Sequence, residues 1–251
     1  MRYPEASGQE RALQSADFIV ALFKFVVLIF SLCVHESAHA WVASRLGDQT
    51  ARLQGRVTLN PMYHVDPIGS LLFPAVIIFG PFLGFSLFSG ALIGWARPTP
   101  IITRNFRRIT RDDNLTTLAG PASNLLLVLI AFVTLVIIAH AIPNGGPTVL
   151  ESFRAAFMRG ANSNSHPVVM LCALAIFVNL SLFFFNLFPI PPLDGSRLVR
   201  NALPYNAMQS YDRISGWLSF LLMFFLGGYV LQFFLLPSLS LVFYGLYLLV
   251  K

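Results

Sequence analysis

His35, Glu36 and His39 form the pattern His-Glu-x-x-His near the end of a long apolar stretch. Residues four positions apart lie on the same face of an α-helix, so the two imidazoles can bind one zinc ion. The glutamate beside them can then act as a general base toward a water molecule. The preceding residues 18–34 are apolar except for one lysine and one serine. Because ionisable groups within a membrane segment are costly unless they have a task, this setting favours a metal site over histidines without a metal.

Asp194 is the best candidate for a third metal ligand. It follows a turn that begins at Asn186 and has the sequence Asn-Leu-Phe-Pro-Ile-Pro-Pro-Leu. Three prolines in four residues cannot continue a regular helix, so we expect a rigid extended turn that directs the Asp194 carboxylate. The alternative is that Asp194 caps the helix that begins near Gly195. With three protein ligands, one zinc ion per chain keeps a fourth position for the water that Glu36 would deprotonate.

Three further polar residues are secondary candidates for the site. His64 and Asp66 lie in the turn-rich connection of residues 60–69 and could reach the metal or line its entrance. Equally, they could cap the next helix or satisfy the loop backbone. Asn186, which opens the proline-rich turn, is the third of these candidates. Asn124 is a separate case, since an amide in an apolar helix either joins neighbouring helices by hydrogen bonds or binds a substrate backbone near the zinc.

The composition is that of an integral membrane protein. Of the 251 residues, 56% are hydrophobic and only 11% are charged, whereas charged residues make up about a quarter of an ordinary soluble domain. The mean hydropathy is +0.69, and several apolar runs have the length of about 20 residues that crosses a bilayer. We expect one membrane domain over residues 1–251, with a core at 18–200 and C-terminal helical segments at 217–250. A regulatory or substrate-selecting domain would then have to be a separate protein.

The net charge of +6 does not indicate nucleic-acid binding. Most basic residues lie in short loops beside apolar runs, where the positive-inside rule and anionic lipid headgroups account for them. We therefore expect a multi-pass membrane protein, in contact with the lipid bilayer, whose metal site lies toward the cytoplasmic side.

The apolar runs predict an all-α polytopic fold with about five to six membrane segments. The expected segments are residues 18–46, 71–95, 115–140, 168–188, 217–234 and 236–250. Segment 71–95 is interrupted by prolines and glycines, so it either re-enters the membrane or crosses it. A re-entrant segment would keep both flanking basic loops on the cytoplasmic side.

A small β-hairpin or sheet is expected between the first two membrane segments. Residues 49–60 alternate polar and apolar side chains, which is the period-two pattern of a strand. A helical substrate must unwind before its backbone can be attacked, and a strand at this place could pair the exposed groups by β-addition. Val57 and Leu59 are accordingly tentative substrate-binding residues.

Taken together, the motifs resemble those of the site-2 proteases, a family of intramembrane zinc metalloproteases. The pattern at residues 35–39 matches the metal motif of that family, and residues 120–124 are similar to its G-P-x-x-N motif. Residues 186–195 resemble its N-x-x-P-x-P-P-L-D-G motif, and residues 94–98 also resemble the compact prokaryotic type, which has no PDZ or CBS domain. The resemblance covers about residues 31–200 of this sequence.

This resemblance implies a hydrolase in which His35, His39 and Asp194 bind zinc and Glu36 is the general base. It also implies that Asn124 helps to position the substrate. The resemblance to the compact prokaryotic type implies a prokaryotic cell membrane as the location. The expected substrates are transmembrane or membrane-associated proteins, cleaved within or near the cytoplasmic half of this membrane.

Two other functions fit part of the pattern. One is a catalytically idle relative that binds membrane helices as a chaperone or regulator, and the other is a metal-ion transporter. Neither function needs a general base beside the metal, so the presence of Glu36 favours the protease.

Overall fold

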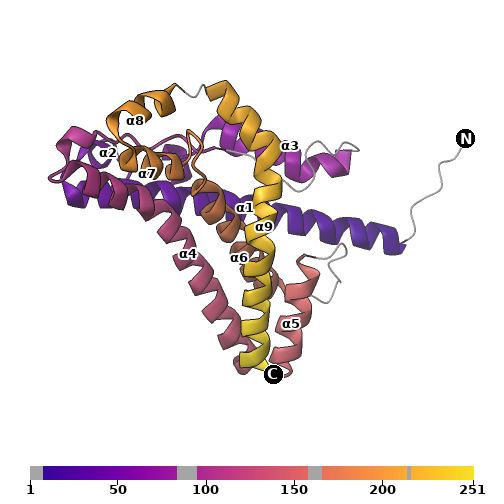
Figure 1. Cartoon of the computed structure of the whole chain (residues 1–251). Coiled ribbons are helices and arrows are strands. Elements are labelled where there is room, and N and C mark those ends of the chain that lie inside the picture. The colour runs from indigo at the N-terminus through magenta and orange to yellow at the C-terminus, as the bar shows by residue number, and fades with distance from the viewer. Residues whose placement is uncertain (1–7, 84–94, 158–165, 214–215) are drawn as a thin grey trace, which may run out of the picture.

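The structure, a computed structural model, describes residues 8–83, 95–157, 166–213 and 216–251, and it is helical through most of them (Figure 1). The α-helices are α1 (Gly8–Leu46), α2 (Thr50–Leu53), α3 (Phe73–Phe79), α4 (Ile109–Ala141), α5 (Gly145–Ala155), α6 (Pro167–Asn186), α7 (Asp194–Ala202), α8 (Tyr205–Asp212) and α9 (Gly216–Val250).

Four helices in the described ranges are long and apolar enough to cross a membrane, rather than the expected five to six. They cover Asp17–Leu46, Ile109–Ala141, Pro167–Asn186 and Gln232–Val250. The two expected C-terminal segments are one helix, because α9 continues through Pro237. In the turns beside this proline, the Ser238 and Ser240 hydroxyls donate to backbone carbonyls four residues earlier. Such bonds help an apolar helix to tolerate a proline. The chain is an integral membrane protein.

The predicted β-hairpin at residues 49–60 is wrong, since the described residues contain no strand. Asp48 accepts hydrogen bonds from the Thr50 N–H and hydroxyl, which start the single helical turn α2. Gly55 then takes a left-handed conformation with φ of 73°. The Arg56 guanidinium is buried and donates to the carbonyls of Tyr63 and Arg97 instead of facing water. The alternating pattern therefore does not separate a buried face from a solvated one.

The predicted segment 71–95 is described up to residue 83, and residues 84–94 lie outside the described part of the chain. A π-helical turn at Pro67–Leu72 leads into α3 and then into a 3₁₀ turn at Gly80–Leu83. Beyond the gap, the Trp95 N–H donates to the Gly69 carbonyl at 3.2 Å and the Arg97 N–H donates to the His64 carbonyl at 2.8 Å. The two ends of the segment therefore lie together.

Helix α4 packs against both α1 and α6, and this group of three helices forms the frame of the site. The apolar core includes Leu135 on α4 and Leu174 and Ile176 on α6, all fully buried. Three polar residues, Ser31, Asn124 and Asn179, are also almost fully buried, one on each of these helices. Polar groups buried in this way need hydrogen-bond partners, and these three side chains form a chain of hydrogen bonds that ends at His35 of α1.

Candidate metal centre

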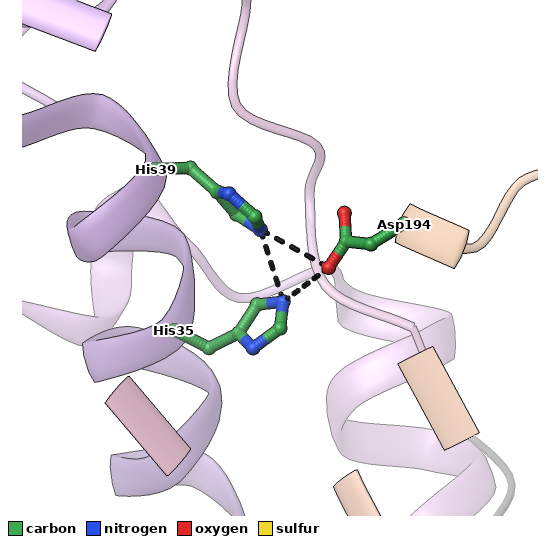
Figure 2. Close-up of side chains that lie close together, drawn as sticks. All are labelled: His35, His39 and Asp194. Atoms are coloured by element: carbon green, nitrogen blue, oxygen red, sulfur yellow. Dashed lines mark hydrogen bonds and ion pairs between the residues drawn. The ribbon is translucent and has the colours of Figure 1, made fainter. Parts of the chain in front are cut away.

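His35, His39 and Asp194 converge on one point, although Asp194 is about 160 residues away in sequence (Figure 2). The Nε2 atoms of His35 and His39 lie 3.1 Å apart. The Asp194 Oδ2 atom lies 3.1 Å from the His35 Nε2 and 3.3 Å from the His39 Nε2. The side chains of the two histidines are 4% and 6% exposed and that of Asp194 is 15% exposed, so the carboxylate is the most accessible of the three.

Hydrogen bonds to the far side of each ring leave both Nε2 atoms with a lone pair. The His39 Nδ1 atom lies 2.7 Å from the Thr116 carbonyl, which can only accept, so this nitrogen carries the hydrogen. The His35 Nδ1 atom lies 2.7 Å from the Asn124 Oδ1 and likewise donates. Such second bonds orient metal-binding imidazoles and raise their basicity.

The three converging atoms fit a zinc ion. Two nitrogen lone pairs and a carboxylate oxygen would repel one another at these distances unless a cation lay between them. Tetrahedral zinc with bonds of about 2.0–2.1 Å places neighbouring ligand atoms about 3.3 Å apart, close to the 3.1–3.3 Å found here. The group is the one set of three or more potential ligands found among the described residues.

A buried hydrogen-bond relay across three helices fixes the tautomer of His35. The Ala175 carbonyl can only accept, so the Asn179 Nδ2 atom faces it at 2.8 Å and also donates to the Ser31 hydroxyl. The Asn179 Oδ1 atom then accepts from the Asn124 Nδ2 at 2.8 Å, which turns the Asn124 Oδ1 toward His35. Both ends of the Asn124 amide are therefore engaged, and its contact with substrate stays a prediction.

Replacing Asn179 with leucine is expected to weaken zinc binding about tenfold, the lower end of the range for groups that orient metal ligands. Leucine has a similar size but leaves the Asn124 amide without its acceptor, so the amide can turn and release His35. The dissociation constant would be measured by competition with a zinc chelator in detergent. Ser181→Ala is the control, since the Ser181 hydroxyl is also buried in α6 but bonds only to the local Phe177 carbonyl. Equal affinities for the Asn179→Leu variant and the unmodified protein would exclude the relay.

Asp194 is the first residue of α7, and its carboxylate does not cap this helix. Leu193 occupies the N-cap position, and α7 has no side-chain cap hydrogen bond. The predicted alternative of an N-cap therefore does not describe this residue.

Helix α7 is fixed to the start of α4 by a polar cluster around Asp113. The Arg197 guanidinium pairs with the Asp113 carboxylate, and Asn201 donates to the same carboxylate at 2.7 Å. Asp113 is buried, and a buried ion pair that is also hydrogen-bonded constrains the elements that carry it. The cluster therefore positions Asp194 against α1.

Gly120 provides the space in which the imidazoles meet. A Cβ atom at this position would lie 2.4 Å from the His39 Nε2 and 2.6 Å from the His35 Nε2. Because packed atoms do not approach so closely, the site requires a glycine here. This requirement was not predicted, although the glycine belongs to the G-P-x-x-N motif.

The other predicted residues have local contacts. The His64 ring contacts the Thr58 carbonyl at 2.7 Å, and the Asp66 carboxylate accepts from the N–H groups of Ile68 and Gly69. The Asn186 amide donates to the carbonyl of Leu182, one turn earlier in α6. The contacts of His64 and Asp66 are those of the alternative stated above, in which these side chains cap the next helix or satisfy the loop backbone.

Val57 and Leu59 are exposed in an irregular segment. Their expected role depended on a strand that is absent from the described residues, so we do not propose it further. The Glu36 carboxylate accepts hydrogen bonds from Thr99, a residue that no motif had indicated.

Comparisons with known proteins find a protease family and relatives named as zinc metalloproteases. The profile of Peptidase family M50 matches residues 23–229. A protein of Bacillus subtilis named "Putative zinc metalloprotease YwhC" is 39% identical over 210 residues, which cover 82% of each chain. A protein of Mycolicibacterium smegmatis named "Putative zinc metalloprotease Rip2" is 30% identical over 199 residues, 76% of this chain and 63% of that protein.

No solved structure matches the chain. The family profile nevertheless covers well over half of the sequence, and it includes the His-Glu-x-x-His pattern and Asp194. The chain therefore belongs to peptidase family M50, the site-2 proteases, and is a zinc metalloprotease.

Proposed function

We propose that the protein is an intramembrane endopeptidase that cleaves transmembrane or membrane-associated proteins within or near the cytoplasmic half of a prokaryotic cell membrane. The observation that carries this proposal is the place of the metal group. Both histidines lie in the C-terminal half of a helix that is apolar enough to span a membrane, and both are buried against α4. We place the whole activity in one domain over residues 1–251.

Each residue of the site has a role in this proposal. His35, His39 and Asp194 hold the zinc ion, which when bound lowers the pKa of water to about 7 and polarises a carbonyl group. Glu36 takes a proton from the water as its oxygen forms a bond to the carbonyl carbon of the substrate. When the carbon–nitrogen bond breaks, Glu36 returns this proton to the departing amine. One water molecule is consumed and the glutamate is restored.

The proposed orientation is supported by the distribution of charge. Helices α2, α7 and α8 lie together at one end of the molecule, and α5 and the C-terminus lie at the other (Figure 1). The exposed arginines at residues 45, 52, 104, 107, 108 and 111 lie at the C-terminal end of α1, in α2, and in or just before the first turn of α4. These elements meet at the first end, where the Arg107 N–H donates to the Leu46 carbonyl. By the positive-inside rule this end is cytoplasmic, and Asp194 at the start of α7 belongs to it.

The proposal is tested with the purified protein in liposomes that also contain a single-span substrate protein. We expect cleavage inside or next to the membrane segment, located by mass spectrometry of the fragments. Dialysis against a zinc chelator is expected to reduce the rate to background, and one equivalent of zinc is expected to restore it, because the donor set loses its metal reversibly.

Other outcomes of the same experiment identify the alternatives. Binding of the substrate without cleavage, at any zinc concentration, would indicate a helix-binding chaperone or regulator. Accumulation of zinc inside the liposomes without proteolysis would indicate a transporter. Cleavage restricted to a soluble segment far from the bilayer would contradict the intramembrane part of the proposal.

A further inference from the structure

Both hydrogen-bond donors of Thr99 contact the carboxylate of Glu36. Its backbone N–H donates to the Glu36 Oε2 at 3.0 Å, and its hydroxyl lies 2.7 Å from the same oxygen. The hydroxyl is also 3.1 Å from the backbone carbonyl of Glu36. Among the described residues, no hydrogen bond engages the other carboxylate oxygen, Oε1.

Thr99 is itself held rigidly, so it can fix a flexible side chain. It lies between Pro98 and Pro100, whose rings restrict the backbone. On one side the Arg97 N–H donates to the His64 carbonyl, and on the other the Ile102 N–H donates to the Asp48 carboxylate at 2.7 Å. Asp48 is fully buried just beyond the end of α1. The segment of residues 95–102 is therefore anchored on both sides of Thr99, to the loop at His64 on one side and to Asp48 on the other.

We propose that Thr99 is a positioning residue. It holds the Glu36 carboxylate through Oε2, so that Oε1 is the oxygen that takes the proton from water and later returns it. This inference rests on the proposed function, in which Glu36 is the general base. A free glutamate side chain loses rotamer entropy when it is ordered. Thr99 provides this order before the substrate arrives, so that it is not a part of the activation barrier.

The contact serves Glu36 in both of its protonation states. When Glu36 is a carboxylate, two charge-assisted hydrogen bonds occupy Oε2 and leave Oε1 to accept the proton from water. When Oε1 carries the proton, Oε2 is a carbonyl oxygen and still accepts from the same two donors. The side chain therefore need not turn between taking the proton and giving it to the amine.

The test measures kcat and KM for cleavage of a single-span substrate in liposomes by the Thr99→Val and Thr99→Ser variants. Valine keeps the shape of threonine but removes the hydroxyl, and we expect kcat to fall about tenfold, the effect of one charge-assisted hydrogen bond. We expect KM and the zinc content to stay unchanged. Serine keeps the hydroxyl, so its kcat should stay within about twofold of the unmodified protein. Thr103→Val, an exposed site on the same connection, is the matched control and should have no effect.

An unchanged kcat for Thr99→Val, or an increase in KM alone, would overturn the positioning role. If this variant lost its zinc, Thr99→Ala would be compared with Thr99→Ser, and the absence of a gap in kcat between them would overturn the role as well. A failure of the proposed function looks different. The unmodified protein would not cleave, or Glu36→Gln would cleave at the same rate, and either result would remove the basis of the inference.

Discussion

Replacement of Glu36 by glutamine is expected to reduce peptide-bond cleavage by about 10²–10⁴-fold, the contribution of a positioned general base. Glutamine has nearly the same shape, and its amide oxygen can accept from Thr99 as the Glu36 Oε2 does. It cannot take a proton from water at neutral pH. The rate should therefore fall because of the lost base and not because of a displaced side chain.

The zinc content of the Glu36→Gln variant is expected to equal that of the unmodified protein. Glu36 is not among the three residues whose ligand atoms converge, and the hydrogen bonds of both imidazoles do not involve its side chain. Metal analysis of the purified protein checks this expectation beside the cleavage assay. Glu151→Gln makes the same change at an exposed position of α5 and is the control.

Two results would contradict this assignment of Glu36. If Glu36→Gln cleaved within about tenfold of the normal rate, the effect would be too small for a general base. If the variant lost its zinc, Glu36 would belong to the metal site. In that case the fall in rate would have to be attributed to the missing ion.

The sequence predicted the membrane helices well where hydrophobicity alone determines them. The expected segment 168–188 corresponds to α6, and the end of the first segment at residue 46 corresponds to the end of α1. Gly47 follows with φ of 122°, a conformation that suits a glycine after a helix. The same reasoning divided α9 at Pro237, because the penalty for proline in water does not carry over to an apolar helix.

The predicted strand was wrong because an alternating pattern gives a strand only when a partner and a buried face exist. Just before this segment, Asp48 accepts a hydrogen bond from the N–H of Thr50, the first residue of the helical turn α2. Within the segment, the Arg56 guanidinium donates hydrogen bonds to two loop carbonyls. Both residues act through contacts with the connection of residues 60–105. No local pattern within residues 49–60 contains that information.

His35 and His39 could be singled out as candidates because imidazoles are uncommon in an apolar segment and their spacing fits one face of a helix. Asn179 and Thr99 could not be found in this way, since an asparagine or a threonine is unremarkable by type. Their roles depend on which residues α4, α6 and the segment of residues 95–102 bring to α1. These contacts depend on the packing of elements that are far apart in the sequence.

Replacement of Gly120 by alanine is expected to weaken zinc binding by about 100-fold or more, at or beyond the upper end of the range for residues that orient ligands. The added methyl group would lie 2.4 Å from the His39 Nε2 and 2.5 Å from the His35 Cε1. Carbon and nitrogen atoms in contact are normally about 3.5 Å apart. At least one imidazole would have to leave its place, and cleavage would be lost with the metal.

Gly120→Ala is expected to weaken zinc binding, but helix propensity predicts that it does not destabilise α4. Measuring zinc content and thermal stability together therefore distinguishes loss of the metal site from loss of the fold. Alanine is more favourable than glycine by about 1 kcal/mol inside a helix, and Gly120 lies within α4. We therefore expect the Gly120→Ala variant to remain folded, with a thermal unfolding temperature close to that of the zinc-free unmodified protein. Metal analysis and a thermal scan of both proteins, each prepared with and without zinc, check the two expectations.

Gly245→Ala in α9 is the matched control for this change. A Cβ atom there would lie 3.5 Å from the Phe132 ring, which is an ordinary contact. This variant should keep its zinc and its activity. If Gly120→Ala also kept both, the imidazoles could not occupy the positions that bring their Nε2 atoms within 3.1 Å of each other. The metal would then have to be held in another arrangement, because a methyl group at residue 120 and this arrangement of the two histidines exclude one another.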